Sequence, residues 1–211
     1  MILTRADQKI PKELLDKISR FCDVPREAVI PAQTVGSIYD VPLNLQKHKV
    51  GQIIGDRLGL GELKPNMTAW EEGRDRHEAA KRSIPIALVG KYTHLEDAYL
   101  SVLEAIKSAA VHNKRKAEIV WIDSELLEQK DAATWKELKR CKGMVIPGGF
   151  GIRGIEGKIA AAKYARTKKI PYLGLCLGSQ ILAIEFARAK LKDKDLTSEE
   201  FDEEKKQRKS K

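Results

Sequence analysis

Short apolar runs alternate with helix-like segments through the second half of the chain. The apolar runs are IPIALVG at 84–90, AEIVWID at 117–123, GMVIPGG at 143–149 and IPYLGLC at 170–176. Each is followed by a segment with helical spacing of its apolar residues, at 97–113, 133–140, 154–168 and 180–189. Because strands joined by crossover helices produce this alternation, the pattern predicts an α/β fold with a parallel sheet.

The first part of the chain has a different pattern. Apolar residues recur with helical spacing from Ile10 to Cys22 and again from Val50 to Leu58, where glycines follow. The stretch 24–35 contains two prolines and predicts loops with short extended pieces. Residues 62–83 are polar and charged, which is typical of a partly helical linker. We therefore expect one segment at 1–61, a linker at 62–83 and a second domain at 84–211 that ends in a charged tail.

Charge and cysteine content narrow the class of protein. The 211 residues carry a formal net charge of +9, but the basic residues are scattered and only 6% of residues are aromatic. Nucleic acid is therefore a minor alternative, and nucleotide phosphates are a sufficient partner for the excess charge. Three cysteines without paired spacing predict no disulfide framework and no metal site, and indicate a reducing, cytoplasmic compartment. No apolar run is long enough to predict a signal peptide or a membrane span.

One cysteine stands in a context that favours chemistry. Cys176 lies between Gly174 and Gly178, just after an apolar run and just before a helix-like segment. Glycines permit a sharp strand-to-helix turn, and the positive end of the helix dipole favours a thiolate. A lone cysteine is more often structural, but the flanking glycines favour a nucleophile at this position.

A glycine-rich loop follows the preceding apolar run. Gly148, Gly149 and Gly151 come directly after the strand-like GMVIP. A glycine loop alone is weak evidence, since most are only turns. In a parallel sheet, however, this loop and the Cys176 turn both lie at the carboxyl ends of strands, where such folds bind ligands. Together they are expected to supply a nucleophile and an oxyanion hole.

The same residues carry a resemblance to a known family. PGGFGIRG and PYLGLCLGSQ resemble the glutamine amidotransferase domain of CTP synthases, the ligases that aminate UTP. IALVGKYTHLEDAYLSVLEAIKSA and IEFARAKLKDKDLTSEEF are similar to further parts of that domain. The stretch from LTRADQK to SIYDVPL resembles the end of the synthetase domain of the same family. The resemblance extends to about Phe201 and implies the end of a synthetase domain at 1–61 and a partial class I amidotransferase domain at 84–211.

The resemblance implies roles for individual residues. Cys176 is the expected nucleophile. The residues expected to bind the oxyanion and glutamine are Gly148, Gly149, Leu177, Gly178, Ser179, Gln180 and Glu200. The residues expected to bind nucleotide are Arg5, Lys17, Gln33, Thr34 and Val35. Lys17 is equally well explained as an exposed helix lysine. The QTVGSIY segment departs from the family at several side chains, so we expect Gln33, Thr34 and Val35 to bind adenine through their backbone.

The chain also departs from a complete enzyme. The family draws a His and a Glu from far downstream of its nucleophile, but none of His48, His77, His94 and His112 follows Cys176. His94 is interpreted as a surface loop residue. No phosphate-binding G-x-x-x-x-G-K-[ST] motif occurs, and the Mg²⁺ ligands of the family are not in this chain. We therefore expect part of a larger enzyme that is inactive alone and only marginally stable, with one sheet edge and one apolar helix face unpaired.

The family further implies partners for the whole enzyme. These are glutamine, UTP, ATP with Mg²⁺, GTP as an allosteric effector, and a homotetrameric assembly. An inactive glutamine-binding or regulatory module derived from the amidotransferase domain is the alternative function. Another α/β cysteine hydrolase is a third possibility, against which the SIYDVPL segment counts.

Overall fold

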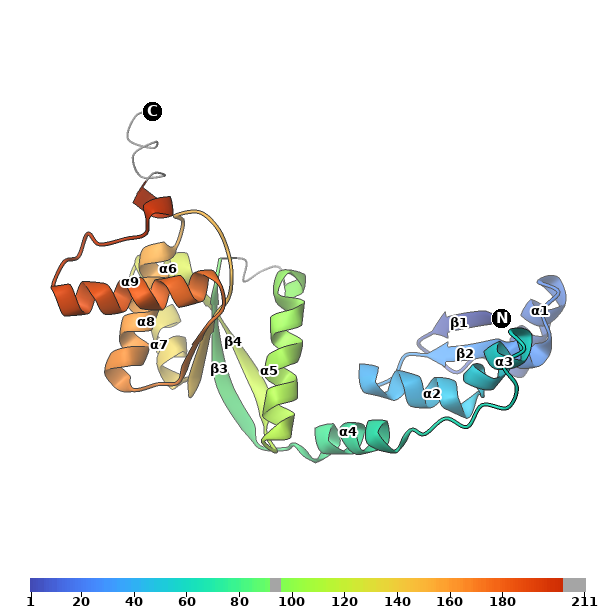
Figure 1. The fold of residues 1–211 in the computed structure, drawn as a ribbon. Helices are drawn as coiled ribbons and strands as arrows, with labels where there is room; N and C mark the ends of the chain where they lie inside the picture. The colour runs from blue at the N-terminus through green and yellow to red at the C-terminus, as the bar shows by residue number, and fades with distance from the viewer. Residues whose placement is uncertain (92–95, 203–211) are drawn as a thin grey trace. The chain divides into compact units, whose positions relative to one another are not determined.

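The structure is a computed structural model that describes residues 1–91 and 96–202 (Figure 1). It divides into two compact units, Met1–Ala79 and Ala80–Lys211. His94, which was interpreted as a surface loop residue, and most of the charged tail lie outside the described residues. Each unit is described by itself.

The first unit is built on a pair of parallel strands. Strand β1 (Ile2–Ala6) pairs with β2 (Val29–Gln33), with Ile2 opposite Val29 and Ala6 opposite Gln33. The helices and short 3-10 turns of this unit are α1 (Lys12–Phe21), η1 (Arg26–Ala28), η2 (Ile38–Asp40), α2 (Val41–Lys47), α3 (Val50–Arg57) and α4 (Thr68–Ala79). The helices predicted at 10–22 and 50–58 are confirmed as α1 and α3, whereas β1 and α2 were not predicted from the sequence.

The helix α1 buries less of its apolar side than its spacing indicates. Leu15 is 4% exposed and packs inward, but Phe21 at the end of the helix is 82% exposed. The Lys17 ammonium lies 5.7 Å from the centre of the Phe21 ring, so this aromatic side chain contacts a cation at the surface.

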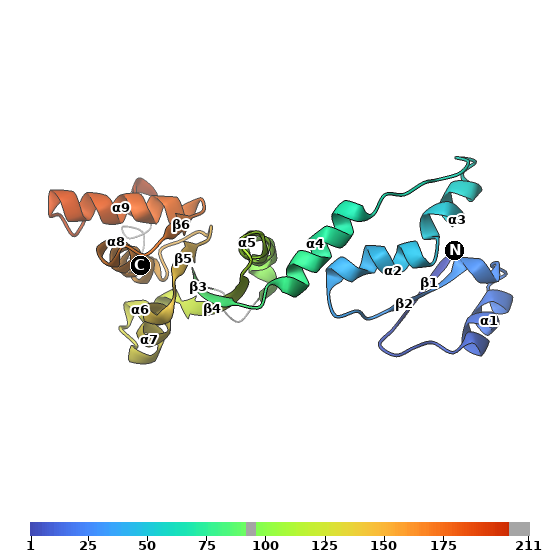
Figure 2. The same cartoon turned by 90° about the horizontal axis from the view of Figure 1, so that it is seen from below.

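The second unit is a four-stranded parallel sheet with the strand order β4-β3-β5-β6. Its strands are β3 (Ser83–Gly90), β4 (Lys116–Asp123), β5 (Gly143–Ile146) and β6 (Tyr172–Gly174). The helical segments are η3 (Glu96–Tyr99), α5 (Leu100–His112), α6 (Ser124–Glu128), α7 (Ala132–Arg140), α8 (Ile155–Lys168) and α9 (Leu177–Leu191). The predicted α/β fold with a parallel sheet and crossover helices is thus confirmed (Figure 2).

The two faces of this sheet are covered by different helices. Alternate strand residues such as Val89 and Ile146 form one cluster with apolar side chains of α6, α7, α8 and α9. Leu88 and Val145, which point to the other face, pack with Leu103 of α5 (Figure 1). Because both faces are covered, the strands are mainly apolar, which is why their runs were visible in the sequence.

The outer strand β6 and the helix α9 expose apolar side chains. Leu173 of β6 is 54% exposed, and Phe186 of α9 is 50% exposed. The strand β6 pairs only with β5 among the described residues, so its other side forms a sheet edge. An unpaired edge with exposed apolar side chains favours association.

Candidate functional site

Cys176 occupies a strained turn between β6 and α9. Its backbone has φ 49° and ψ −107°, a combination that L-residues rarely adopt. The residue is exposed, and it precedes the first residue of a helix that runs from Leu177 to Leu191. Strain of this kind at an exposed thiol is what a nucleophile on a strand-to-helix turn requires.

This turn requires glycine at two positions because the backbone of another segment lies where a side chain would begin. A Cβ on Gly174 would stand 2.4 Å from the carbonyl carbon of Gly178. A Cβ on Gly178 would stand 2.0 Å from the carbonyl oxygen of Ile146. Helix α9 therefore packs directly on the ends of β5 and β6, at a distance that no other residue type permits.

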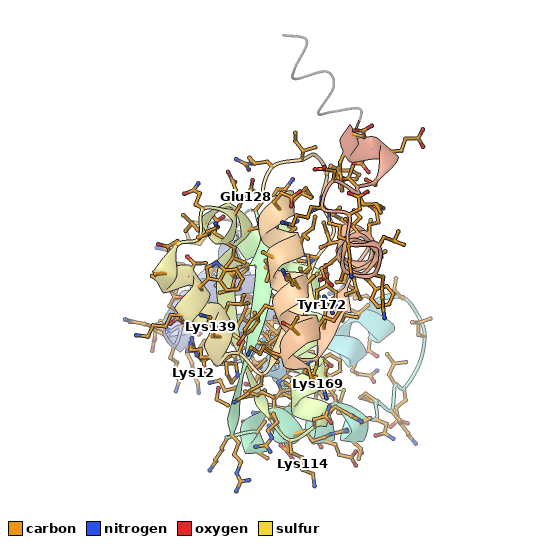
Figure 3. All side chains as sticks on the ribbon, turned by 90° about the vertical axis from the view of Figure 1, so that its left-hand side faces the viewer. Lys12, Lys114, Glu128, Lys139, Lys169 and Tyr172 are labelled. Atoms are coloured by element: carbon orange, nitrogen blue, oxygen red, sulfur yellow. The ribbon has the colours of Figure 1, made fainter. Side chains whose placement is uncertain are left out.

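Hydrogen bonds fix the turn from both sides. The Leu175 amide donates to the Ile146 carbonyl at 3.0 Å, and the Ser179 hydroxyl donates to the Cys176 carbonyl at 2.6 Å. The Tyr172 hydroxyl donates to the Gly178 carbonyl at 2.7 Å, and burial raises the pKa of this phenol above its ordinary value. The Tyr172 side chain is labelled in Figure 3. The Cys176 backbone is thus held by contacts to β5, β6 and α9.

The glycine-rich loop after β5 lies directly beside the Cys176 turn. A Cβ on Gly148 would stand 3.6 Å from Cys176 Cβ, and one on Gly149 would stand 3.4 Å from Leu177 Cδ2. Within the part of the chain that the structure describes, the amides of Gly149 and Leu177 have no hydrogen-bond acceptor. The structure thus brings together the thiol and the backbone amides that the sequence singled out for an oxyanion hole.

A buried lysine that the sequence reasoning missed supports this loop. Lys91 follows β3 and is 9% exposed. Its ammonium donates to the carbonyl oxygens of Phe150 at 2.5 Å and Gly151 at 2.9 Å. Since these bonds cross 59 and 60 positions of sequence, no local pattern marked Lys91 as a neighbour of the loop.

The other residues predicted to bind glutamine are placed less closely. Gly178, Ser179 and Gln180 lie in the first turn of α9, where Ser179 and Gln180 are exposed. Glu200 is exposed, and none of its described contacts reaches Cys176. The neighbouring Phe201 is 1% exposed and packs in the same cluster as Leu177.

The three thiols have different surroundings. Cys141 is buried, and this burial raises the pKa of its thiol to about 11. Cys22 and Cys176 are both exposed, but Cys22 ends α1 in an ordinary conformation with φ −98° and ψ 2°. Only Cys176 of the three combines exposure with a strained turn.

No histidine of the described residues contacts Cys176. His77 stacks on Tyr39 at 4.4 Å between ring centres, His112 ends α5, and His48 follows α2. Within residues 1–91 and 96–202, no group of three or more His, Cys, Asp or Glu side chains is arranged to hold a metal ion.

Part of the predicted nucleotide set comes together at the carboxyl ends of β1 and β2. Arg5 donates to the Thr34 hydroxyl at 3.5 Å, and Thr34 donates to Asp7 at 2.6 Å. Gln33 and Val35 flank Thr34, but Lys17 lies over the Phe21 ring on α1, and no hydrogen bond among the described residues joins it to this group. The Arg5 guanidinium is therefore hydrogen-bonded to the Thr34 hydroxyl, which itself donates to Asp7.

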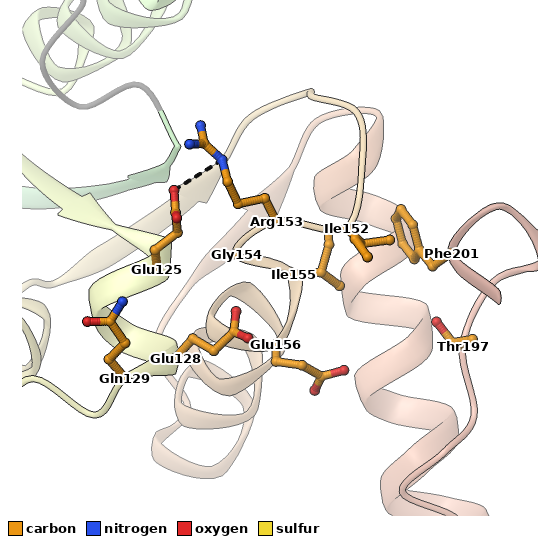
Figure 4. A pocket seen from close by; sticks show the side chains of 10 residues that line it. All are labelled: Glu125, Glu128, Gln129, Ile152, Arg153, Gly154, Ile155, Glu156, Thr197 and Phe201. Atoms are coloured by element: carbon orange, nitrogen blue, oxygen red, sulfur yellow. Dashed lines mark ion pairs between the residues drawn. The ribbon is translucent and has the colours of Figure 1, made fainter. Parts of the chain in front are cut away.

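An acidic cavity of about 370 Å³ lies beside α6 and α8 (Figure 4). Glu125 in its wall forms an ion pair with Arg153 at 3.2 Å, and Glu156 pairs with Arg188 at 2.7 Å. Burial is the main cause that raises the pKa of Glu128, with the charges of Glu156 and Glu125 acting in the same direction. Cys176 is not among the residues that line this cavity, so it is separate from the thiol site.

Comparisons with known proteins show the family to which the chain belongs. The profile described as "Glutamine amidotransferase class-I" matches residues 94–210, and "CTP synthase N-terminus" matches residues 1–60. The CTP synthase of Symbiobacterium thermophilum is 48% identical over 203 residues, which are 95% of this chain and 38% of that protein. The CTP synthase of Roseiflexus castenholzii is 50% identical over 188 residues, 89% of this chain and 34% of that protein.

A solved structure is similar to part of this chain. The glutaminase domain of Trypanosoma brucei CTPS with bound acivicin is 42% identical, with a TM-score of 0.53, over 57% of this chain and 47% of that chain. The chain spans less than two fifths of the length of the curated relatives named above. No helix among the described residues is long and apolar enough to cross a membrane. The chain belongs to the class-I glutamine amidotransferase family, and its relatives in that family are CTP synthases.

Proposed function

We propose that this chain carries the glutamine-cleaving nucleophile of CTP formation. In the whole reaction, ammonia from glutamine aminates UTP to CTP at the cost of ATP. The observation that supports this proposal is the strained, exposed Cys176 turn beside the free amides of the Gly148–Gly149 loop. A structural cysteine needs neither the strain nor the exposure.

In the proposed step, the Cys176 thiolate attacks the side-chain amide carbon of glutamine. The C–S bond forms, and the carbonyl electrons move to oxygen to give a tetrahedral intermediate. This intermediate expels the amide nitrogen, which takes up a proton and leaves as ammonia, so that a γ-glutamyl thioester remains on Cys176. Water then hydrolyses the thioester to glutamate and restores the thiol.

Backbone amides stabilise the negative oxygen of the intermediate in this proposal. Those of Gly148, Gly149 and Leu177 are the proposed donors, and loss of one such donor costs about 2.7–4 kcal/mol in other enzymes. Lys91 supports this arrangement in the proposal, because its ammonium donates to the carbonyl oxygens of Phe150 and Gly151, which follow in the same loop.

The general base and acid of the reaction are not assigned to this chain. A thiol without a histidine partner is mostly protonated near neutral pH unless its surroundings favour the thiolate. We therefore propose that the chain forms the thioester slowly and once, and that it shows no glutamine turnover above background.

The nucleotide partners belong to the same proposal. Arg5, Thr34 and their neighbours would contact ATP or UTP, with GTP as effector and a homotetramer as the assembly of the cytoplasmic whole enzyme. The described residues do not fit a Mg²⁺ site, so no step proposed for this chain runs through the metal.

The alternative proposal is a glutamine-binding or regulatory module without chemistry. Glutamine could bind beside Cys176 without reacting, but the strain at Cys176 counts against this alternative. A covalent adduct separates the two proposals, because a binding module forms none.

The experiment is an acid quench of the folded chain after incubation with isotopically labelled glutamine. The nucleophile proposal predicts up to one equivalent of γ-glutamyl label on the peptide that contains Cys176, with no label in C176S. Bound glutamine without any covalent label would support the module instead. Turnover at ordinary enzyme rates, on the order of 1–1,000 per second, would contradict the absence of a base.

A further inference from the structure

A lysine behind the glycine loop is buried without a counter-charge. Lys158 of α8 is 1% exposed, the largest side chain among the most deeply buried ones. Its ammonium lies 3.7 Å from the point where a Cβ on Gly149 would stand. A Cβ on Gly148, the preceding residue of the loop, would stand 3.6 Å from Cys176 Cβ. Lys158 and Cys176 thus lie against neighbouring positions of the same loop.

The charged groups around α8 do not neutralise Lys158. Glu128 of α6 accepts a hydrogen bond from the Gly157 backbone, and Glu185 of α9 is bound by both arms of Arg166. Neither carboxylate lies within ion-pair distance of the Lys158 ammonium in the described part of the chain. The charge that acts on it most is the Lys91 ammonium, which is also positive. Burial, and secondly this repulsion, lower the pKa of Lys158 to about 8.

A buried cation without a partner costs free energy, so its presence calls for an anion nearby. Around neutral pH, Lys158 keeps its proton with a pKa of about 8, and it lies in a low-dielectric setting where its field is weakly screened. The space on the other side of the Gly148–Gly149 loop is where the thiolate and the negative oxygen of the intermediate are proposed to form. Electrostatic stabilisation from a fixed charge is the usual use of such a group.

We propose that Lys158 is a positioning residue whose buried positive charge, acting through the Gly148–Gly149 loop, stabilises negative charge at Cys176. This inference rests on the proposed function, since it assigns Lys158 to the same site. Lys158 does not touch the reacting atoms. It raises the reactivity of Cys176 while it lowers the stability of the fold, the opposite of what a packing residue does.

The test uses the alkylation of Cys176 by neutral iodoacetamide and anionic iodoacetate at pH 7, followed on peptides by mass spectrometry. Three chains are compared: the natural one, K158M, and K163M as a matched control. Lys163 lies on the same helix and is exposed. The unfolding midpoint in urea is measured for each chain.

We expect K158M to slow iodoacetamide labelling of Cys176 by about threefold or more relative to Cys22, because one nearby charge has been removed. The unfolding midpoint of K158M should be equal or higher, and K163M should leave both quantities unchanged. An unchanged Cys176 rate in K158M would overturn the inference, and so would a slower rate together with a lower midpoint.

A measurement on the natural chain covers the case in which K158M does not fold. The iodoacetate-to-iodoacetamide rate ratio at Cys176 should be higher in the folded chain than in urea, since a buried cation attracts the anionic reagent. An equal ratio would overturn the inference alone. Labelling of Cys176 no faster than that of Cys22 would instead overturn the proposed nucleophile, and this inference with it.

Discussion

Replacement of Gly178 by alanine tests whether α9 packs on β5 as closely as the structure indicates. In an ordinary helix position, alanine in place of glycine stabilises a protein by about 1 kcal/mol. At Gly178, however, the new Cβ would stand 2.0 Å from the Ile146 carbonyl oxygen and 2.9 Å from its carbon. Both are backbone atoms of a buried strand, so neither is able to rotate away.

The magnitude follows from these two opposing effects. Overpacking a core with one methyl group costs about 1–3 kcal/mol and more where the backbone must shift. We expect G178A to lower the free energy of unfolding by about 3 kcal/mol, which exceeds the helical gain of about 1 kcal/mol. The sign of the change is therefore the diagnostic quantity.

The assay is urea unfolding followed by tryptophan fluorescence in a W70F background. Trp121 and Trp135, the remaining tryptophans, both lie in the second unit. The matched control is A183G, the reverse exchange at an exposed position of the same helix, which should cost about 1 kcal/mol. A G178A chain as stable as the natural chain, or more stable, would refute the close packing of α9 on β5.

Three further predictions concern stability and association. E185Q should lower the free energy of unfolding by about 1–2 kcal/mol, since Glu185 is 3% exposed and accepts from Arg166 at 2.7 and 2.8 Å. E137Q, in an exposed ion pair with Arg140, should change it by less than about 0.5 kcal/mol, and equal effects of the two variants in urea unfolding would contradict this prediction. Folding lowers the pKa of Lys158 from 10.5 to about 8, so the unfolded chain binds more protons than the folded chain between these pH values. The free energy of unfolding should therefore rise by roughly 1–3 kcal/mol from pH 8 to pH 10, and this rise should be absent in K158M and present in K163M. The exposed edge of β6 should make the chain associate, so L173K should shift sedimentation toward monomer more than the control L126K on α6, where Leu126 is 40% exposed. A natural chain that stays monomeric at high concentration would contradict association through this edge.

The sheet of the second unit was predictable because both of its faces are covered. Its strands are mainly apolar, apart from charged residues such as Glu118 of β4, and the segments between them repeat apolar residues at helical spacing. The short helix α6 escaped prediction because it has only five residues and begins at the Asp123 cap, whose carboxylate accepts from the Glu125 amide at 2.7 Å. The strand β1 was missed because its five residues, Ile-Leu-Thr-Arg-Ala, show no alternation of apolar and polar side chains, although their burial alternates.

The candidate site was predictable only where the chain marks it locally. The glycines around Cys176 are neighbours in sequence, so the turn was visible as a motif. Lys91 and Lys158 reach the loop across the fold, and nothing in the local pattern distinguishes them from the other lysines of a basic chain. Their contribution depends on burial, which sequence periodicity does not give for a charged residue in a helix or at the end of a strand.

The reactivity of Cys176 toward a substrate analogue tests the central claim most directly. The folded chain is treated with an electrophilic analogue of glutamine, with and without excess glutamine, and the adduct is mapped by mass spectrometry. The account predicts that Cys176 is modified first and that glutamine protects it. Exposed Cys22 should react slowly and buried Cys141, whose pKa is raised to about 11, more slowly still. Equal labelling of Cys176 and Cys22, with no protection by glutamine, would contradict the assignment of Cys176 as the nucleophile.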